Sequence, residues 1–242
     1  MSILLYQIPL SHYCEKVRWT LDYKGLQYTA KNLLPGLHVK TIKKIAPQSS
    51  VPVLQHEGRI VQGSAQIITY LEDRFPEKKL MPANSLDAQT AVEWERYFDN
   101  DIGVHVRRYL YHTILKHPSL TADLLGAGGP FWAKPFLRLI FPGLSKKMRK
   151  YMDINDASTE VSKRHIQKAL KRINDSLENK KYLVGDRFSR ADLCAAALLA
   201  PLFMPAKYGL SWPHKLPEPL QSEIEALAPQ LQWAKDIYAR HR

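Results

Sequence analysis

The chain has 242 residues, of which 45% are hydrophobic and 24% are charged, and this composition excludes a disordered or fibrous protein. No run of 18 uncharged apolar residues predicts a membrane span, and the first residues do not resemble a secretory signal. The chain has two cysteines, Cys14 and Cys194, so we expect no disulfide framework and a cytoplasmic protein.

The net charge of +12 is concentrated in one part of the chain. Residues 124–152 contain six basic side chains and no acidic one, whereas the rest of the second half is nearly neutral. A protein that follows a nucleic-acid backbone would be expected to carry a more extended basic surface. We therefore expect no nucleic-acid partner, and we attribute the charge to attraction of anionic ligands, or of an anionic surface to this one segment.

The first eighty residues alternate short apolar runs with helical patterns, which is typical of an α/β domain. The expected elements, in chain order, are a strand at 3–8, a helix from 13 that ends at Gly25, a strand from 26, a short helix at 39–45, strands at 51–54 and 60–61, and a helix at 64–75. The βαβ order favours parallel strands, and Glu57-Gly58 favours a tight turn between the last two strands. Ser64 is expected to cap the last helix.

From Pro82 onward the sequence contains no convincing strand. Long helices are expected at 85–115, 157–177, 189–200 and 218–239. The segment between the first two, 118–152, is rich in glycine, proline, aromatic and basic residues, and we expect its prolines to interrupt any long amphipathic helix. The change in composition near residue 80 predicts a boundary between an N-terminal domain at 1–80 and an all-helical domain at 85–242.

The segment Phe188–Leu193 predicts a well-defined helix start. The side chains of Ser189 at the N-cap and Asp192 three residues later can each accept a hydrogen bond from the other residue's free backbone N–H, as in a capping box. Phe188 and Leu193 flank this pair as a hydrophobic staple, and the apolar residues that follow predict a buried helix. The motif is a folding signal rather than a source of chemistry.

Together with Val51-Pro52 at the start of a strand, the Tyr182–Asp192 motif resembles the soluble glutathione transferase superfamily, and the resemblance covers nearly the whole chain apart from 118–152. It implies a thioredoxin-like N-terminal domain (βαβ, helix, ββα), an all-α C-terminal domain and glutathione as co-substrate. It also implies a homodimer with contacts through 64–75 and 85–115. The implied chemistry is attack of the glutathione thiol on an apolar electrophile, as in detoxification.

Ser11 lies between the first strand and the first helix, where the resemblance places the activating residue. Its hydroxyl would donate a hydrogen bond to the glutathione thiolate, assisted by the partial positive charge of the helix N-terminus. Cys14 occupies the second position of a glutaredoxin-like C-x-x-C in which Ser11 replaces the first cysteine. Two interpretations stay open for each: Ser11 activates the thiol or only caps the helix, and Cys14 is a nucleophile or a packed side chain.

The resemblance also implies where glutathione binds. Val51-Pro52 corresponds to a cis-proline turn whose exposed backbone pairs with the cysteinyl part of glutathione. Ser64 and the amides at the helix N-terminus would bind the γ-glutamyl carboxylate.

Other glutathione contacts depart from the pattern of the family. Gly63 stands where relatives commonly have an acid or an amide, and Gln62 is the candidate that compensates for this missing side chain. Lys40 and His38 are candidates for the glycyl carboxylate, although they align only loosely with the family.

An apolar acceptor is expected to bind between the two domains, near Tyr109, Trp132 and Trp212. For the aromatic and basic residues 131–150, three interpretations stay open: a flap over this pocket, a helix hairpin packed on the core, or an element that touches an anionic membrane. No metal site is expected, because the spacing of the histidines gives no i,i+4 pair of ligands.

Two other classes of function stay open beside the transferase. Gly63 favours a non-catalytic interaction module that resembles the bacterial stringent-starvation protein, whereas Cys14 would serve a monothiol glutathione-dependent reductase that acts on mixed disulfides. The presence of Ser11, Val51 and Ser64 together favours the transferase.

Overall fold

The computed structural model describes residues 2–242, and the N-terminal part is built on one four-stranded sheet. Its elements are β1 (Ile3–Gln7), α1 (His12–Tyr23), β2 (Tyr28–Asn32), α2 (His38–Ile42), β3 (Val53–His56), β4 (Arg59–Gln62) and α3 (Ser64–Arg74). The strand order is β2-β1-β3-β4, with β1 parallel to β2 and antiparallel to β3. This arrangement confirms the predicted thioredoxin-like fold, including the parallel βαβ unit.

The alternation of side chains along the strands buries both faces of the sheet. On one face, Leu5 and Leu54 pack with Val17 of α1 and with α3. On the other face, Tyr6, Val53 and Ile42 of α2 form a second cluster. The β3–β4 hairpin turns at Glu57-Gly58, where both residues have positive φ angles of 51° and 76°, as a tight hairpin turn requires.

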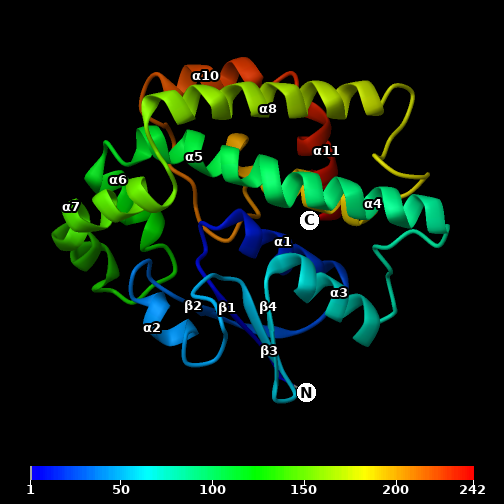
Figure 1. Cartoon of the computed structure of the whole chain (residues 1–242), viewed down its shortest axis with the longest axis horizontal. Helices are drawn as coiled ribbons and strands as arrows, with labels where there is room; N and C mark the ends of the chain where they lie inside the picture. The colour runs from blue at the N-terminus through cyan, green and yellow to red at the C-terminus, as the bar shows by residue number, and fades with distance from the viewer. Residues whose placement is uncertain (1) are drawn as a thin grey trace.

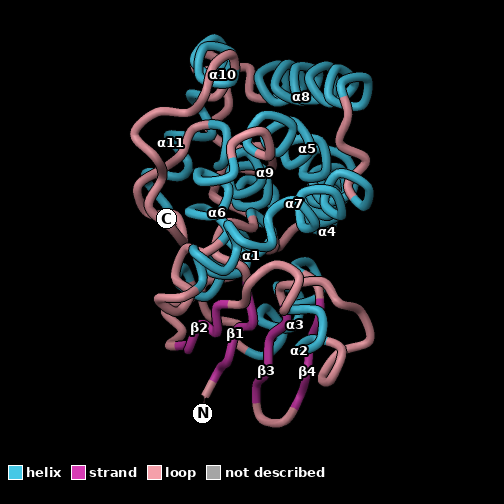
Figure 2. The backbone as a smooth tube through the Cα atoms, turned by 90° about the vertical axis from the view of Figure 1, so that its left-hand side faces the viewer, coloured by secondary structure: helices cyan, strands magenta, loops and turns pink. Residues whose placement is uncertain are grey.

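The remainder of the chain is helical, as predicted, and stacks over one end of the sheet-containing part (Figures 1 and 2). Its elements are α4 (Ser85–Tyr97), η1 (Phe98–Ile102), α5 (Gly103–Ile114), α6 (Pro118–Leu125), α7 (Ala133–Tyr151), α8 (Asp156–Ser176), α9 (Arg190–Leu199), η2 (Ala200–Leu202), α10 (Leu220–Leu227) and α11 (Gln232–His241). Among residues 2–242, no helix has the length and apolar character needed to cross a bilayer.

Two predicted helices differ from the observed ones. The helix expected at 85–115 contains the π-helical segment η1, which separates α4 from α5. The helix expected at 218–239 is two helices, α10 and α11, joined by a short connection around Pro229. Proline lacks a backbone N–H and restricts the residue before it, so a break near Pro229 has a clear local cause.

The expectation that prolines interrupt any long amphipathic helix in 118–152 was wrong. Helix α7 runs for 19 residues through Pro142. Pro135 lies in its first turn, where the missing N–H would have no intrahelical partner anyway. Pro142 lies on the exposed face, where water can replace the lost hydrogen bond. The segment is therefore a continuous helix, and Leu137, Phe141 and Met148 bury its inner face.

Helix α9 is the centre of the helical core, and every residue in it is buried. The predicted capping box is present at its start. The Asp192 carboxylate accepts hydrogen bonds from the Ser189 backbone N–H at 2.9 Å and from the Leu183 backbone N–H at 2.8 Å. Burial raises the pKa of Asp192 to about 6, although these hydrogen bonds act in the opposite direction.

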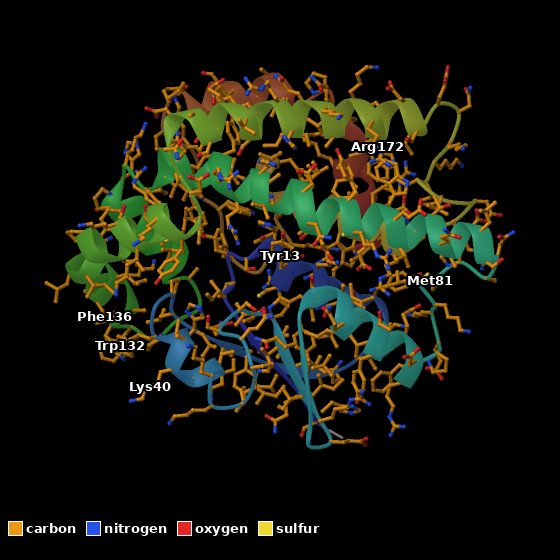
Figure 3. The ribbon with its side chains drawn as sticks, in the orientation of Figure 1. Tyr13, Lys40, Met81, Trp132, Phe136 and Arg172 are labelled. Atoms are coloured by element: carbon orange, nitrogen blue, oxygen red, sulfur yellow. The ribbon has the colours of Figure 1, made fainter. Side chains whose placement is uncertain are left out.

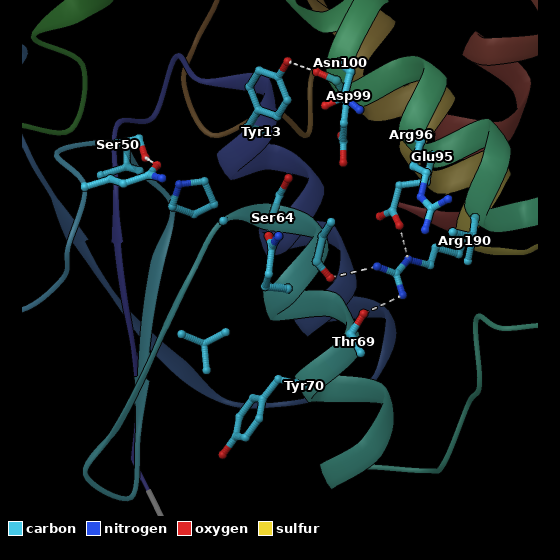
Figure 4. A pocket seen from close by; sticks show the side chains of 18 of the residues that line it. Tyr13, Ser50, Ser64, Thr69, Tyr70, Glu95, Arg96, Asp99, Asn100 and Arg190 are labelled. Atoms are coloured by element: carbon cyan, nitrogen blue, oxygen red, sulfur yellow. Dashed lines mark hydrogen bonds and ion pairs between the residues drawn. The ribbon is translucent and has the colours of Figure 1, made fainter.

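A buried group of ion pairs connects the two parts of the chain (Figure 4). The Glu95 carboxylate on α4 lies 2.7 Å from Lys16 Nζ on α1 and 2.7 Å from Arg190 Nε on α9. Lys16 Nζ also lies 2.7 Å from Asp99 Oδ2 in η1. Arg190 continues to α3, where it donates to Thr69 Oγ1 and to the Ala65 carbonyl. Because these contacts cross between the halves, they fix α3 against the helical part.

Candidate active site

Two hollows meet where the sheet-containing part faces the helices. One is an open cleft of about 1180 Å³ between α3, the loop before β3 and the α4–η1 segment. The other is a cavity of about 550 Å³ bounded by the start of α1, by α5 and by α7. Four residues line both hollows: Tyr13, Ser50, Val51 and Arg107. A molecule in the cleft can therefore reach a molecule in the cavity at this junction.

The expected cis peptide bond is confirmed at Val51-Pro52. The Pro52 carbonyl accepts a hydrogen bond from Gly63 N–H at 3.1 Å, which holds this turn beside the start of α3. Both residues line the cleft.

The start of α3 forms the side of the cleft opposite α4. Figure 4 shows Ser50 and Ser64 on one side, with Glu95 and Asp99 across from them. Ser64 is the first residue of the helix, and the N-cap is Gly63, so the expectation that Ser64 is the cap was wrong by one residue. The φ angle of Gly63 is 95°, a conformation that glycine adopts readily.

The side chain of Gln66 fills the space above Gly63. A Cβ atom at position 63 would lie 2.4 Å from Gln66 Oε1, so a larger residue at 63 would displace this amide. Gln66 also lines the cleft. Gln66, one turn later in the helix, therefore places an amide beside position 63, and only the structure reveals this.

The expected compensating residue, Gln62, is used differently. Its amide nitrogen donates to the carbonyls of Gln48 and Ser50 at 2.9 and 2.8 Å, and its Oε1 accepts from Gln48 N–H at 3.1 Å. Gln62 is absent from the residues that line the cleft. The structure therefore gives it the role of holding the loop that leads to Val51.

The two candidates for the glycyl carboxylate are not brought to the cleft. Lys40 is exposed on α2 and lines neither hollow, and Figure 3 shows it at the outer edge of the molecule, away from Tyr13. His38 lines the cavity and accepts a hydrogen bond from Gly36 N–H at 3.1 Å. Burial lowers the pKa of His38.

Ser11 and Cys14 have very different environments. Ser11 is the N-cap of α1, accepts from the Cys14 backbone N–H at 3.4 Å, and lines the cavity next to the junction. Cys14 is completely buried, and burial raises the pKa of its thiol. A buried thiol with a raised pKa is poorly suited to be a nucleophile. Of the two interpretations of Cys14, the structure favours the packed side chain.

Comparison with known proteins identifies this arrangement. The family model for the glutathione S-transferase N-terminal domain matches residues 5–79, and the model for the C-terminal domain matches residues 135–218. The chain belongs to the glutathione transferase superfamily. It is 25% identical to the glutathione S-transferase TCHQD of Arabidopsis thaliana over 219 residues, covering 82% of this chain and 76% of the relative.

Two further comparisons agree with this assignment. The maleylacetoacetate isomerase of Dictyostelium discoideum is 28% identical over 201 residues, covering 80% of this chain and 76% of the isomerase. The structure of the β-etherase LigF from Sphingobium sp. strain SYK-6 superposes with a TM-score of 0.66 at 22% identity, covering 99% of this chain and all of the etherase. The structural likeness supports the fold of the family alone.

Within this glutathione transferase fold, two of the three expected acceptor-pocket residues lie elsewhere. Tyr109 is in the core, where its hydroxyl donates to Glu223 Oε2 at 2.8 Å, and Tyr111 lines the cavity instead. Trp132 lies at the surface near Phe136, as Figure 3 shows, and the two rings pack edge to face. Trp212 does line the cavity, as expected.

The segment 118–152 forms one wall of the cavity. Leu124 and Leu125 of α6, together with Leu144 and Met148 of α7, are among the lining residues. Figure 1 shows α6 and α7 together at one end of the helical part. The same helices pack on the core, which favours the packed-hairpin interpretation, and their place in the cavity wall is compatible with a flap. Contact with an anionic membrane stays a prediction.

Tyr13 lines both hollows, although no motif in the sequence marks it. Its hydroxyl donates to the Asp99 carbonyl at 2.6 Å, across the boundary between the two parts. Burial raises the pKa of Tyr13 to about 12. Because its hydroxyl donates to the Asp99 carbonyl, the role of Tyr13 in this transferase fold is to line the junction of the two hollows.

Outside the cleft, the helical part brings Asp101, His105 and His165 together. His165 Nδ1 and His105 Nε2 lie 2.8 and 3.1 Å from the same oxygen, Asp101 Oδ1. These contacts form a hydrogen-bonded group, which accounts for the proximity of the three side chains. Spacing in the sequence could not reveal it, because His165 comes from α8. The expected absence of a metal stays a prediction.

Proposed function

We propose that this chain is a glutathione-dependent enzyme in which the thiolate of bound glutathione attacks an apolar electrophile. The observation that carries the proposal is the meeting of the two hollows. The cleft is lined by Val51-Pro52, Ser64 and Gln66, and at Val51 it joins an apolar cavity that Ser11 lines. In this proposal Ser11 donates a hydrogen bond to the thiolate, which lies at the N-terminus of α1.

Several observations support glutathione as the ligand of the cleft. Ser64 and the first amides of α3 offer an anion-binding helix N-terminus to the γ-glutamyl carboxylate. Structures of similar fold from Methylobacterium radiotolerans and Methylobacillus flagellatus contain glutathione sulfonate and glutathione. The relatives are named as transferase, isomerase and β-etherase, so the family alone does not select the reaction.

We expect glutathione to raise the melting temperature, since a ligand that binds only the native state stabilises it by mass action. At one hundred times its dissociation constant the stabilisation is about 2.7 kcal/mol, which corresponds to roughly 5–10 °C for a chain of this size. Gln66→Ala should weaken glutathione binding by up to about ten-fold through the loss of one hydrogen bond. Calorimetric titration and thermal melts measure both effects.

The matched control is Gln89→Ala, which removes an exposed amide on α4 that donates to Glu93. It should leave glutathione binding unchanged. A melting temperature unmoved by millimolar glutathione would remove the enzyme proposal and favour the non-catalytic interaction module.

We also propose a homodimer, as the family implies, with contacts through 64–75 (α3) and 85–115 (α4, η1 and α5). We further propose a cytoplasmic location. Both cysteines are free and buried, which agrees with a reducing compartment. Sedimentation at micromolar concentration should give twice the mass of the chain, and a monomer mass would contradict the dimer.

A further inference from the structure

The cavity beside Ser11 carries positive charge in a largely apolar wall. Leu110, Ile114, Met148 and Trp212 are typical of its lining. Its only permanently charged side chains, among the lining residues that the structure describes, are Arg107 of α5 and Lys147 of α7. No aspartate or glutamate is among those residues. An apolar cavity with two cations and no acid is complementary to an apolar molecule that carries negative charge.

Arg107, which is half-buried, differs from the buried cations of this chain. Lys16, Arg18, Lys24 and Arg190 each have a carboxylate oxygen within 2.6 to 2.7 Å. Within residues 2–242, Arg107 has no ion-pair partner, and its buried Nε has no hydrogen-bond partner. Burying a polar N–H without a partner costs free energy, and an anionic ligand would supply the missing partner.

The position of Arg107 also matters. It lines both hollows, so its guanidinium lies at the junction where the two proposed substrates meet. The nearby histidine does not add positive charge there, because burial and then the charge of Arg107 lower the pKa of His12 to about 3. Lys147 lies farther along the chain, on the exposed part of α7 at the cavity wall.

We propose that the cavity selects an apolar, aromatic acceptor that bears an anionic group, and that Arg107 and Lys147 bind this group. Arg107 would orient the acceptor at the junction, and Lys147 would attract it from the side of α7. The proposal rests on the proposed function for the presence of glutathione at the junction. The choice of an anionic acceptor comes from the charges of the cavity.

Two fluorescent probes with the same aromatic frame test this inference without glutathione. One is 8-anilinonaphthalene-1-sulfonate, and the other is N-phenyl-1-naphthylamine, which lacks the sulfonate. The wild-type chain should bind the sulfonate at least about ten-fold more tightly, as one charge-assisted hydrogen bond would give. Arg107→Met should remove most of this preference and leave the affinity for the neutral probe within about two-fold. Lys147→Met should act in the same direction, with a smaller loss.

The matched controls are Arg164→Met and Lys146→Met, which remove exposed charges that do not line the cavity. They should leave the binding of both probes unchanged, and circular dichroism should show every variant to be folded. Equal affinity for the two probes in the wild type would overturn the inference. So would an Arg107→Met variant that loses both probes equally, or one that changes only the titration of the glutathione thiol.

The probe result and the glutathione result are independent. A chain that binds the sulfonate selectively but not glutathione would support the anion-binding cavity and contradict the enzyme proposal. A chain that binds glutathione but does not distinguish the probes would support the enzyme proposal and overturn the anion-binding cavity.

Discussion

Replacement of Glu95 by alanine should lower the free energy of unfolding by about 3–5 kcal/mol, because two buried cations lose their shared partner. The Glu95 side chain is 4% exposed, and the side chains of Lys16 and Arg190 that contact it are 0% and 4% exposed. Asp99 remains for Lys16, whereas Arg190 keeps only the neutral acceptors on α3. Urea denaturation measures the loss.

The control is Glu93→Ala, which removes an exposed carboxylate two residues away on the same helix and should change stability by less than about 0.5 kcal/mol. Burial acts to raise the pKa of Glu95, but Lys16 and Arg190 outweigh it, so the pKa is lowered. Its stabilisation is therefore complete above the unfolded value of 4.5 and is lost as the pH falls through the folded value. Glu95→Gln should remove this acid dependence. A loss below about 1 kcal/mol for Glu95→Ala would contradict the importance of the buried ion pairs.

Replacement of Ser11 by alanine should reduce turnover of an electrophile such as chlorodinitrobenzene by about 10- to 150-fold. The reason is the loss of one hydrogen bond to a charged acceptor, worth roughly 1.5–3 kcal/mol. Glutathione should still bind through Val51 and Ser64, and its thiol should titrate at higher pH in the complex. Steady-state kinetics and the ultraviolet absorbance of the thiolate measure these two effects.

Because Ser11 also caps α1, its replacement should cost about 1 kcal/mol of stability as well. Asn84→Ala separates the two roles, since Asn84 caps α4 through Leu86 and Asp87 and lines neither hollow. It should lower stability by a similar amount with unchanged turnover. Cys14→Ala should keep turnover within a few-fold. If Cys14→Ala instead abolishes activity while Ser11→Ala does not, the reductase alternative is correct.

The sequence predicted the N-terminal fold and the start of α9 well because their signals are local. The apolar runs, the Glu57-Gly58 turn and the capping box each depend on neighbouring residues, and all are present. The acceptor residues depend instead on the phase of a long helix. The π-helical segment η1 changes the rotation between α4 and α5, so a face extrapolated along one straight helix is displaced. Tyr109 and Tyr111 are about 200° apart on α5, so the rotation of this helix decides that Tyr111 rather than Tyr109 lines the cavity.

The environments of Gln66 and Arg107 could not be predicted from the sequence. Each is defined by a group that is absent nearby, a side chain at position 63 or a carboxylate beside the guanidinium. Gln66 covers a position that has no side chain, and Arg107 stands out because no carboxylate approaches it in the described structure. Such features depend on contacts in three dimensions. The one available sequence signal was the unusual Gly63, which marked a place where another residue had to compensate.

Helices α6 and α7 shape the cavity without taking part in the other features that define this fold. These helices contribute no strand, no part of the cis-proline turn and no member of the ion-pair group around Glu95, yet they bound one side of the cavity. Changes at the cavity-lining positions of 118–152 can therefore remodel the cavity while the cleft stays constant. This makes the segment the natural place for divergence among close relatives, and for a mutant library aimed at new acceptors.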